Sequence, residues 1–125
     1  MNVKRCYWEE ISWIPERYDT EYARFVKRKK PETWFKAVDG GVVLGIGCLL
    51  HISLTTVRLS NAFVLPEYRN KGVIKEIVKG RERWARINGF KKIDVRTVKK
   101  YYESLGYVRI KDYKTGGAWY VKNLT

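Results

Sequence analysis

The sequence predicts an α/β fold in which a central mixed sheet carries helices on both faces. Two features indicate this class: a hairpin pattern around Asp39-Gly40-Gly41, and an amphipathic helical pattern that starts near Arg69 and ends at Asn88-Gly89. With shorter apolar runs they give the order β, α, β-β-β, α, β, α, β-β, and hairpins followed by crossover helices imply a mixed sheet. Because no repeat, linker or low-complexity tract interrupts the chain, we expect residues 1–125 to form one domain.

The first half of the chain is expected to contain a strand, a helix and a three-stranded meander. Residues 3–8 form the strand, Asp19 then caps a helix that continues to Arg28, and Pro31 ends it. Residues 33–38 and 42–50 flank the Asp-Gly turn and form a hairpin. Residues 56–65 add a third strand, which Pro66 closes.

The second half alternates helices and strands. In the helix that starts at Arg69, apolar side chains share one face and basic side chains lie largely elsewhere. The apolar face is expected to hold Ile74, Ile77, Val78, Trp84 and Ala85. Residues 92–96 form the next strand, Thr97 caps a short helix over residues 98–105, and Gly106 stops that helix. A strand pair, residues 107–111 and 118–121, completes the sheet.

Charge is the most unusual property of the composition. The chain has 26 Lys and Arg residues against 13 acidic ones, which gives a net charge of +13 and a pI near 9.9. Such an imbalance favours association with polyanions, and nucleic acid is the leading candidate. A basic surface kept for solubility is the alternative.

Several classes of protein are excluded by the sequence. The longest apolar stretch, residues 42–54, contains Gly45, Gly47 and His51 and is shorter than the roughly 20 residues of a membrane helix. The basic N-terminus leads directly into aromatic and acidic residues, unlike a signal peptide, so we expect a cytoplasmic protein without a membrane partner. Cys6 and Cys48 lie outside any metal-ligand spacing, so we expect two buried thiols and no metal site.

A candidate anion site lies where the chain enters the long helix. The segment Leu65-Pro66-Glu67-Tyr68-Arg69-Asn70-Lys71-Gly72 follows an apolar strand. Free backbone N–H groups and the helix dipole make such a helix start a site for a pyrophosphate. Gly72 lets the backbone approach the ligand closely, and Arg69 and Lys71 add positive charge.

This segment resembles the acyl-CoA loop of the GNAT superfamily of N-acyltransferases. The signature there is Arg or Gln, two residues, Gly, one residue, then Gly or Ala; this chain has Ile74 at the last position. The resemblance implies a GNAT-like fold, an acyl-CoA-dependent N-acyltransferase, and acetyl-CoA or another acyl-CoA as cofactor. The cofactor-binding residues that it implies are Val64, Leu65, Arg69, Asn70, Lys71, Gly72, Val73 and Ile74.

A second segment resembles a later signature of the same family. Tyr101-Tyr102-Glu103-Ser104-Leu105-Gly106-Tyr107 has its aromatic pair, short helical turn and Leu-Gly-aromatic ending. The second aromatic of that signature, here Tyr102, is the catalytic residue that protonates the departing thiolate. A Tyr phenol can donate this proton while staying neutral near pH 7.

No general base is assigned from the sequence. Many GNAT enzymes have a Glu on the strand before the acyl-CoA loop, whereas this chain has Ser60 and Asn61 there. His51, the only His, and Glu67 are the nearby groups that could accept a proton.

The acceptor is expected to lie on or near nucleic acid, because basic residues interleaved with aromatics suit a phosphate backbone and unstacked bases. The candidate DNA-binding residues are Arg24, Lys27, Arg28, Lys29 and Lys30. The segments Ser104-Leu105-Gly106-Tyr107 and Gly116-Gly117-Ala118-Trp119 are similar to the Mom-type branch of phage proteins, which modify adenine amino groups in DNA.

Two other functions stay open at this point. The chain could acetylate a small amine or a protein lysine, with its charge incidental. It could also be a non-catalytic basic domain that binds nucleic acid, a hypothesis to which Ile74 and the missing acidic base contribute. The sequence leaves the acyl group, the acceptor and the oligomeric state undetermined.

Overall fold

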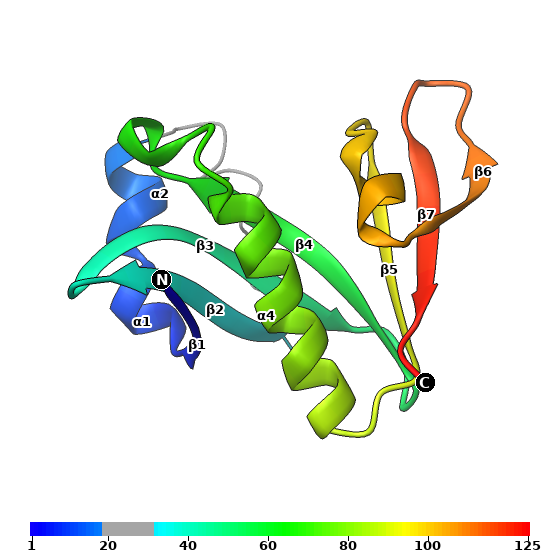
Figure 1. Ribbon diagram of the computed structural model, residues 1–125, viewed down its shortest axis with the longest axis horizontal. Coiled ribbons are helices and arrows are strands. Elements are labelled where there is room, and N and C mark those ends of the chain that lie inside the picture. Colours follow the sequence, from blue (N-terminus) through cyan, green and yellow to red (C-terminus); the bar gives the residue numbers. More distant parts are fainter. Residues whose placement is uncertain (19–31) are drawn as a thin grey trace.

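The computed structural model describes residues 1–18 and 32–125 (Figure 1). The seven strands among the described residues are those that the sequence predicts, in the same order. The elements are β1 (Asn2–Cys6), α1 (Trp8–Ile11), α2 (Trp13–Tyr18), β2 (Glu32–Asp39), β3 (Val42–His51), β4 (Thr56–Val64), the 3-10 helix η1 (Pro66–Tyr68), α4 (Val73–Ile87), β5 (Lys92–Thr97), the 3-10 helix η2 (Tyr101–Leu105), β6 (Val108–Asp112) and β7 (Ala118–Asn123).

The described residues form a seven-stranded sheet in the order β1-β2-β3-β4-β5-β7-β6. Neighbouring strands are antiparallel except β4 and β5, which are parallel. The two pair only where residues 56–58 meet residues 92–94, and beyond this joint they separate into a V (Figure 1). We call strands β1–β4 the β4 arm and strands β5–β7 the β5 arm.

An ion pair holds the joint of the V together. Arg58 Nε lies 2.8 Å from Asp94 Oδ1, and Arg58 Nη2 lies 3.0 Å from Asp94 Oδ2. Trp119 Nε1 on β7 donates to the same carboxylate at 3.1 Å. Because Asp94 is almost fully buried, this bidentate contact fixes the point from which the arms diverge.

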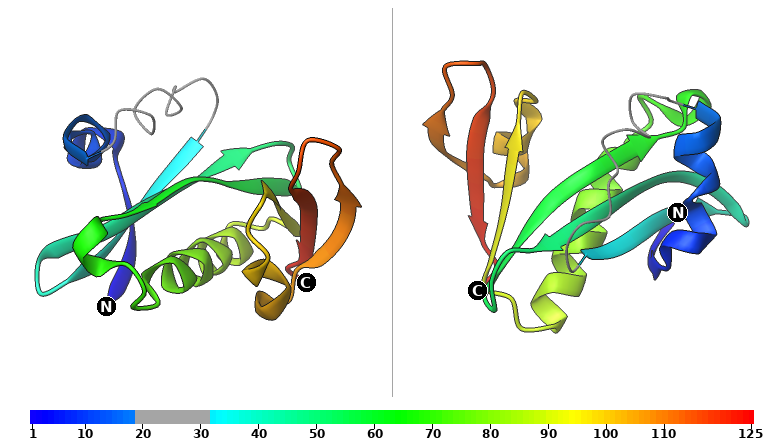
Figure 2. Two further views of the ribbon diagram at one scale, coloured as in Figure 1. Left: turned by 90° about the horizontal axis from the view of Figure 1, so that it is seen from above. Right: turned by 180° about the vertical axis from the view of Figure 1, so that it is seen from behind.

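Helices cover both faces of the β4 arm, as the sequence predicts. α4 packs on one face of β1–β4, while α1 and α2 lie on the other, as Figure 2 shows from above. Phe35, Leu49 and Val78 belong to the core cluster beneath α4, which continues into β5 and β7. Ile11 and Ile14 of the short helices belong to a separate cluster on the opposite face.

Three local predictions need correction. The strand expected over residues 3–8 ends at Cys6, and α1 and α2 follow, a helical pair that the sequence pattern did not indicate. Glu10 stabilises this early turn, because its Oε2 accepts a hydrogen bond from the Tyr7 N–H at 2.7 Å. The helix expected over residues 98–105 is only η2. Thr97 is the last residue of β5, and its Oγ1 accepts from the Lys99 N–H in a turn.

The long helix also differs in its start and in its buried face. Residues 66–68 form η1, and α4 begins at Val73 rather than near Arg69. Ile74 is only half-buried, whereas Val73 packs into the core. Two charged side chains, Arg81 and Glu82, occupy buried positions of α4 among the expected apolar ones. The helix expected from Asp19 to Arg28 falls outside the described residues.

Candidate active site in the V of the sheet

A cavity of about 680 Å³ lies between the diverging arms. One wall is formed by residues 59–64 of β4 and by residues 68–70 and 72–74 at the entry to α4. The other wall is formed by residues 95–97 and 99 and by the two tyrosines Tyr101 and Tyr102, and Arg81 of α4 also contributes. The cavity therefore joins both segments that the sequence singled out.

The start of α4 is shaped as an anion site. Gly72 adopts a left-handed conformation (φ 80°) and its carbonyl accepts from the Glu76 N–H at 3.2 Å, so the helix begins directly after it. No side chain of the described residues caps this end, and a Cβ at Gly72 would meet nothing within 4 Å. The first N–H groups of a helix have no partner within the helix, so they are available to an anion that enters the cavity.

Most of the expected cofactor-binding residues line this cavity. These are Val64, Arg69, Asn70, Gly72, Val73 and Ile74. Arg69 is held across the end of β4, where its Nε donates to the Val64 carbonyl at 2.9 Å. Leu65 and Lys71 are not part of the wall: Leu65 is buried among the side chains of the α1–α2 face, and Lys71 is exposed.

Tyr102 lies on the opposite wall and is buried to 4% exposure. Its ring stacks beside Tyr101 at 4.7 Å and meets Tyr107 edge-on at 5.4 Å between centroids. Burial raises the pKa of the Tyr102 hydroxyl well above its ordinary value. The phenol is thus held protonated at neutral pH, as a proton donor requires.

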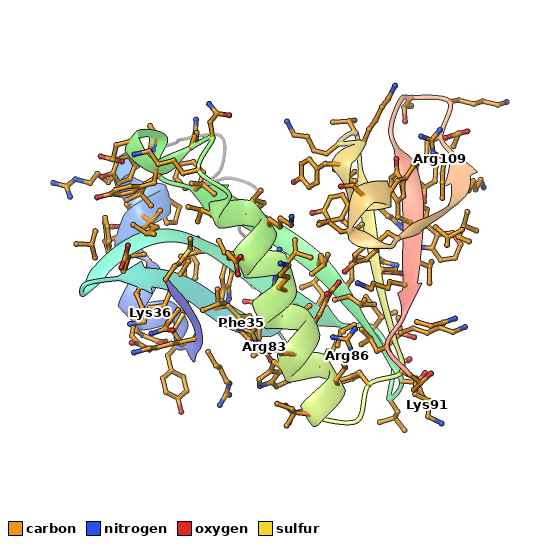
Figure 3. All side chains as sticks on the ribbon, viewed as in Figure 1. Phe35, Lys36, Arg83, Arg86, Lys91 and Arg109 are labelled. Carbon is orange, nitrogen blue, oxygen red and sulfur yellow. The ribbon has the colours of Figure 1, made fainter. Side chains whose placement is uncertain are left out.

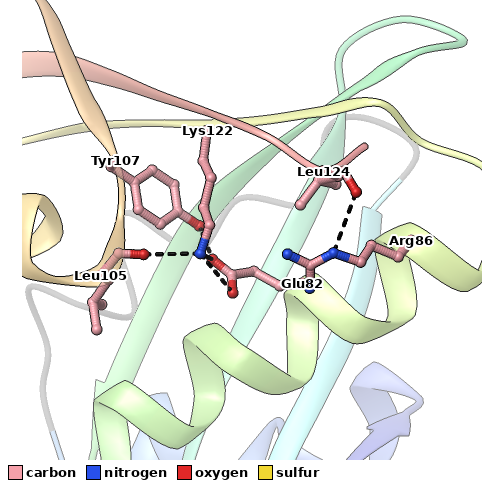
Figure 4. A network of polar contacts seen from close by, with 6 residues as sticks. All are labelled: Glu82, Arg86, Leu105, Tyr107, Lys122 and Leu124. Atoms are coloured by element: carbon pink, nitrogen blue, oxygen red, sulfur yellow. Dashed lines mark hydrogen bonds and ion pairs between the residues drawn. The ribbon is translucent and has the colours of Figure 1, made fainter.

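A polar network fixes the position of η2 against α4 (Figure 4). The Tyr107 hydroxyl donates to Glu82 Oε2 at 2.7 Å, and Lys122 Nζ lies 3.2 Å from the same oxygen. Lys122 also donates to the Leu105 carbonyl at 2.8 Å, which ties the end of η2 to β7. Burial and the adjacent carboxylate both raise the pKa of Tyr107, so it remains a donor to Glu82.

The described walls of the cavity are positively charged. Arg69, Arg81, Arg96 and Lys99 contribute to them, and no Asp or Glu of residues 1–18 and 32–125 does. The expected proton acceptors lie elsewhere. His51 is bound to the Thr33 hydroxyl at 2.8 Å between the rings of Trp84 and Phe90, and Glu67 is exposed on η1.

The candidate DNA-binding residues Arg24, Lys27, Arg28, Lys29 and Lys30 fall outside the described residues. The described part contributes a basic surface of its own, because Lys75, Lys79, Arg83 and Arg86 are all exposed on α4. Figure 3 labels Arg83 and Arg86 on this helix. Within the described ranges, no group of three potential ligands could hold a metal ion, and no helix is long and apolar enough to cross a membrane. Cys6 and Cys48 are both buried as free thiols.

The split mixed sheet, with a helix N-terminus at the mouth of the split, defines an N-acyltransferase fold. The chain belongs to the acetyltransferase (GNAT) family, whose model matches residues 2–107. Membership of this family confirms two predictions from the sequence: the mixed α/β fold and an acyl-CoA-dependent N-acyltransferase. A search of curated proteins gives no match.

Solved structures with the same fold cover nearly the whole chain. Aminoglycoside 6'-acetyltransferase type Ii superimposes with a TM-score of 0.80 at 16% identity, covering 100% of this chain and 98% of that one. The Mycobacterium tuberculosis protein Rv2747 in complex with CoA and NLQ gives 0.80 at 17% identity, with 100% of both chains covered. Spermidine/spermine N-acetyltransferase SpeG from Vibrio cholerae gives 0.75 at 13% identity, covering 98% and 92%.

Sequence reasoning missed two features of the site. Arg81 was not singled out, although a charged residue between Val78 and Ala85 on the apolar stripe was the available signal. The bulge between β3 and β4, where Asn61 has a φ of 50°, was also missed. A positive φ at Asn follows from tertiary pairing, so the sequence alone gave little indication of it.

Proposed function

We propose that the chain transfers an acyl group from acyl-CoA to an amine inside the V-shaped cavity, with residues 1–125 acting as one domain. The observation that carries this proposal is that the free N-terminus of α4 and the buried Tyr102 line one cavity. The pyrophosphate of the cofactor takes the N–H groups that follow Gly72, and Arg69 and Asn70 lie beside it. Val64, Val73 and Ile74, which line the same wall, complete the proposed cofactor contacts.

The chemistry at the inner end follows from the protonation state of Tyr102. The amine nitrogen attacks the thioester carbonyl carbon, and the C–S bond breaks with its electron pair on sulfur. Tyr102 supplies a proton to that sulfur and regains one from the nitrogen of the new amide. Its raised pKa keeps the hydroxyl protonated at neutral pH. Acetyl-CoA is the simplest donor, and CoA is the ligand named for two GNAT structures with this fold.

For the acceptor, we propose an amine on or near nucleic acid, as in the Mom-type modification of adenine. The support is the net charge of +13 and the absence of acidic side chains from the described cavity walls. A polycationic acceptor gains most from carboxylates around its amines. Arg24, Lys27, Arg28, Lys29 and Lys30 are the proposed docking residues. Acetylation of a small amine is the second candidate, because structural neighbours are named as aminoglycoside and spermidine/spermine acetyltransferases.

Two measurements test these proposals separately. Isothermal titration calorimetry with acetyl-CoA should show binding, and its absence at millimolar ligand would overturn the enzyme proposal. Nucleosides from DNA incubated with the protein and acetyl-CoA should gain the mass of an acetyl group. A panel of spermidine, an aminoglycoside and a lysine peptide serves as the matched comparison. If only that panel is acetylated, the nucleic-acid acceptor is wrong and the second candidate replaces it.

A further inference from the structure

Arg81 is completely buried and carries a positive charge that no carboxylate neutralises within the described part of the chain. Its Nη1 donates to the Cys48 carbonyl at 2.9 Å and lies 3.4 Å from the Ser60 carbonyl. Its Nε contacts the Ile77 carbonyl at 3.3 Å, and its Nη2 has no partner among the described residues. A buried guanidinium bound only to carbonyl oxygens is costly, so its presence points to a function.

The nearest acid in the sequence does not compensate this charge. Glu82 follows Arg81 directly, but its carboxylate is already bound to Lys122 and Tyr107 on the β5 arm. Arg81 also acts on the ionisable groups of Cys48, Tyr102 and Tyr107, and burial raises the pKa of all three, so they stay neutral and do not compensate its charge. The guanidinium of Arg81 therefore keeps a positive charge that these neighbours do not neutralise.

Arg81 also fixes an irregular part of the sheet. Cys48 and Ser60 are cross-strand partners at the shift of register between β3 and β4, next to the positive φ of Asn61. The guanidinium binds a carbonyl from each strand at this bulge, where the regular ladder is interrupted. Gly47 makes room for it, because a Cβ at that position would lie 3.0 Å from Arg81 Cζ.

The same bulge borders the inner end of the cavity. Ser60, Asn61, Arg81 and Tyr102 all contribute to its walls. Arg81 follows Val73, the first residue of α4, by eight positions, so it lies about 12 Å along the helix from the proposed pyrophosphate site. The unneutralised charge is thus placed away from the phosphates and beside the proposed proton donor.

We propose that Arg81 is a positioning residue for acyl transfer, which fixes the bulge and stabilises negative charge at the thioester. This proposal rests on the proposed function. When the amine attacks, the carbonyl π electrons move to oxygen; when the intermediate collapses, C=O re-forms and the C–S pair moves to sulfur, which takes the Tyr102 proton. Both the oxyanion and the sulfur pass through a negatively charged stage next to Arg81, a fixed cation that acts strongly because it is itself shielded from water.

The experiment measures the thiol pKa of bound CoA, which requires no acceptor. Wild type, Arg81→Met and Arg81→Lys are saturated with CoA and titrated by the ultraviolet absorbance of the thiolate. We expect the bound thiol of wild type and Arg81→Lys to titrate about one unit below that of Arg81→Met, a tenfold difference in thiolate population at a given pH. Arg83→Met, which removes an exposed cation two positions along α4, should match wild type.

Binding of desulfo-CoA separates this effect from damage to the fold, since its affinity should be equal in all four proteins. If Arg81→Met does not fold, Arg81→Gln takes its place against Arg81→Lys. An unshifted thiol in variants that bind CoA normally would overturn this inference and leave the proposed function intact. Failure of wild type to bind CoA would overturn both.

Discussion

Arg81 and Glu82 are adjacent on α4 and both are buried, yet their surroundings differ. Arg81 faces the β4 arm and meets carbonyl oxygens of β3 and β4, with no carboxylate bound to it in the described part of the chain. Glu82 faces the β5 arm and is bound to Lys122 and to the Tyr107 hydroxyl. One charge is neutralised by its partners, and the other is not.

The comparison gives the two residues different roles. The paired charge of Glu82 holds elements of the fold together, whereas the charge of Arg81 can act on a reacting group. The Glu82 network joins α4 to η2 and β7 (Figure 4). It is a second connection between the two arms, because β4 and β5 pair only at the joint of the V. Removing such a paired charge leaves its partners unsatisfied. Removing a charge that no carboxylate neutralises relieves a desolvation cost, which offsets part of the stability lost with its hydrogen bonds.

Tyr102→Phe should produce the largest effect, because both charges bear on Tyr102. The Glu82 network positions the 3-10 helix that carries it, and the Arg81 charge acts on its hydroxyl. Loss of a general acid lowers turnover by roughly 10²–10⁴-fold, about 3–5 kcal/mol of transition-state stabilisation. Thiol release from acetyl-CoA measures turnover, while calorimetry should show unchanged CoA affinity. Tyr101→Phe is the matched control, and equal losses in both variants would mean that Tyr102 is not the proton donor.

Glu82→Met should destabilise the fold by about 3 kcal/mol, because Lys122 and the Tyr107 hydroxyl lose their partner in a buried setting. Urea unfolding measures the change. Glu103→Met removes an acid that pairs with Arg109 at the surface, and it should change the free energy of unfolding little. Arg81→Met should destabilise the fold less than Glu82→Met, because it removes a desolvation cost together with the hydrogen bonds to the Cys48 and Ser60 carbonyls. Equal destabilisation by Arg81→Met and Glu82→Met would remove the distinction between the two charges.

The sequence predicted those parts of the fold whose signals are local. The Asp39-Gly40 turn and the apolar stripe of α4 have the periodicity and turn residues that specify a hairpin and an amphipathic helix. The α1–α2 pair was missed because its helices are short and are stabilised by burying Ile11 and Ile14 against the sheet. Packing of this kind leaves no pattern long enough to recognise in sequence.

The site, too, was predictable only where its signals are local. The loop before α4 and the Tyr102 segment each have residues at the spacing of a family signature, and the structure brings both segments to one cavity. The roles assigned to these residues remain predictions. Arg81 was not predicted, because its significance depends on facing Cys48 and Ser60 across the molecule. Sequence distance gives no indication of such a contact.

Gly72→Glu should weaken acetyl-CoA binding at least tenfold, a loss of affinity that the Arg81 variants should not share. The substitution places a carboxylate at the helix N-terminus, where it takes the N–H groups proposed for the pyrophosphate. Gly72→Asn is the matched control, because Asn tolerates the left-handed φ of 80° and a Cβ there meets nothing within 4 Å. Calorimetry should show near-normal affinity for Gly72→Asn, and equal weakening in both would assign the effect to backbone strain.

The smallest effect is expected from exposed cations, which differ from Arg81 in being screened by salt. We expect the protein to bind double-stranded DNA through counterion release, so that log affinity falls linearly with log salt concentration. Contact with about five phosphates gives a slope of roughly −4 to −5. Reversal of Lys27, Arg28 and Lys29 to Glu should flatten this slope by about three contacts and leave acetyl-CoA affinity unchanged.

The matched variant for that experiment reverses Lys75, Lys79 and Arg83, three exposed cations on the solvent face of α4. Both triple variants change the net charge equally, by six units, so a general loss of positive charge would flatten the two slopes alike. A larger change for residues 27–29 would assign DNA docking to that segment; a larger change for α4 would move it to the helix that also carries Arg81. In the second case, DNA and the buried charge would share one helix, and salt would distinguish them: it should weaken DNA binding and leave the thiol pKa of bound CoA almost unchanged, because the field of a buried cation is screened much less.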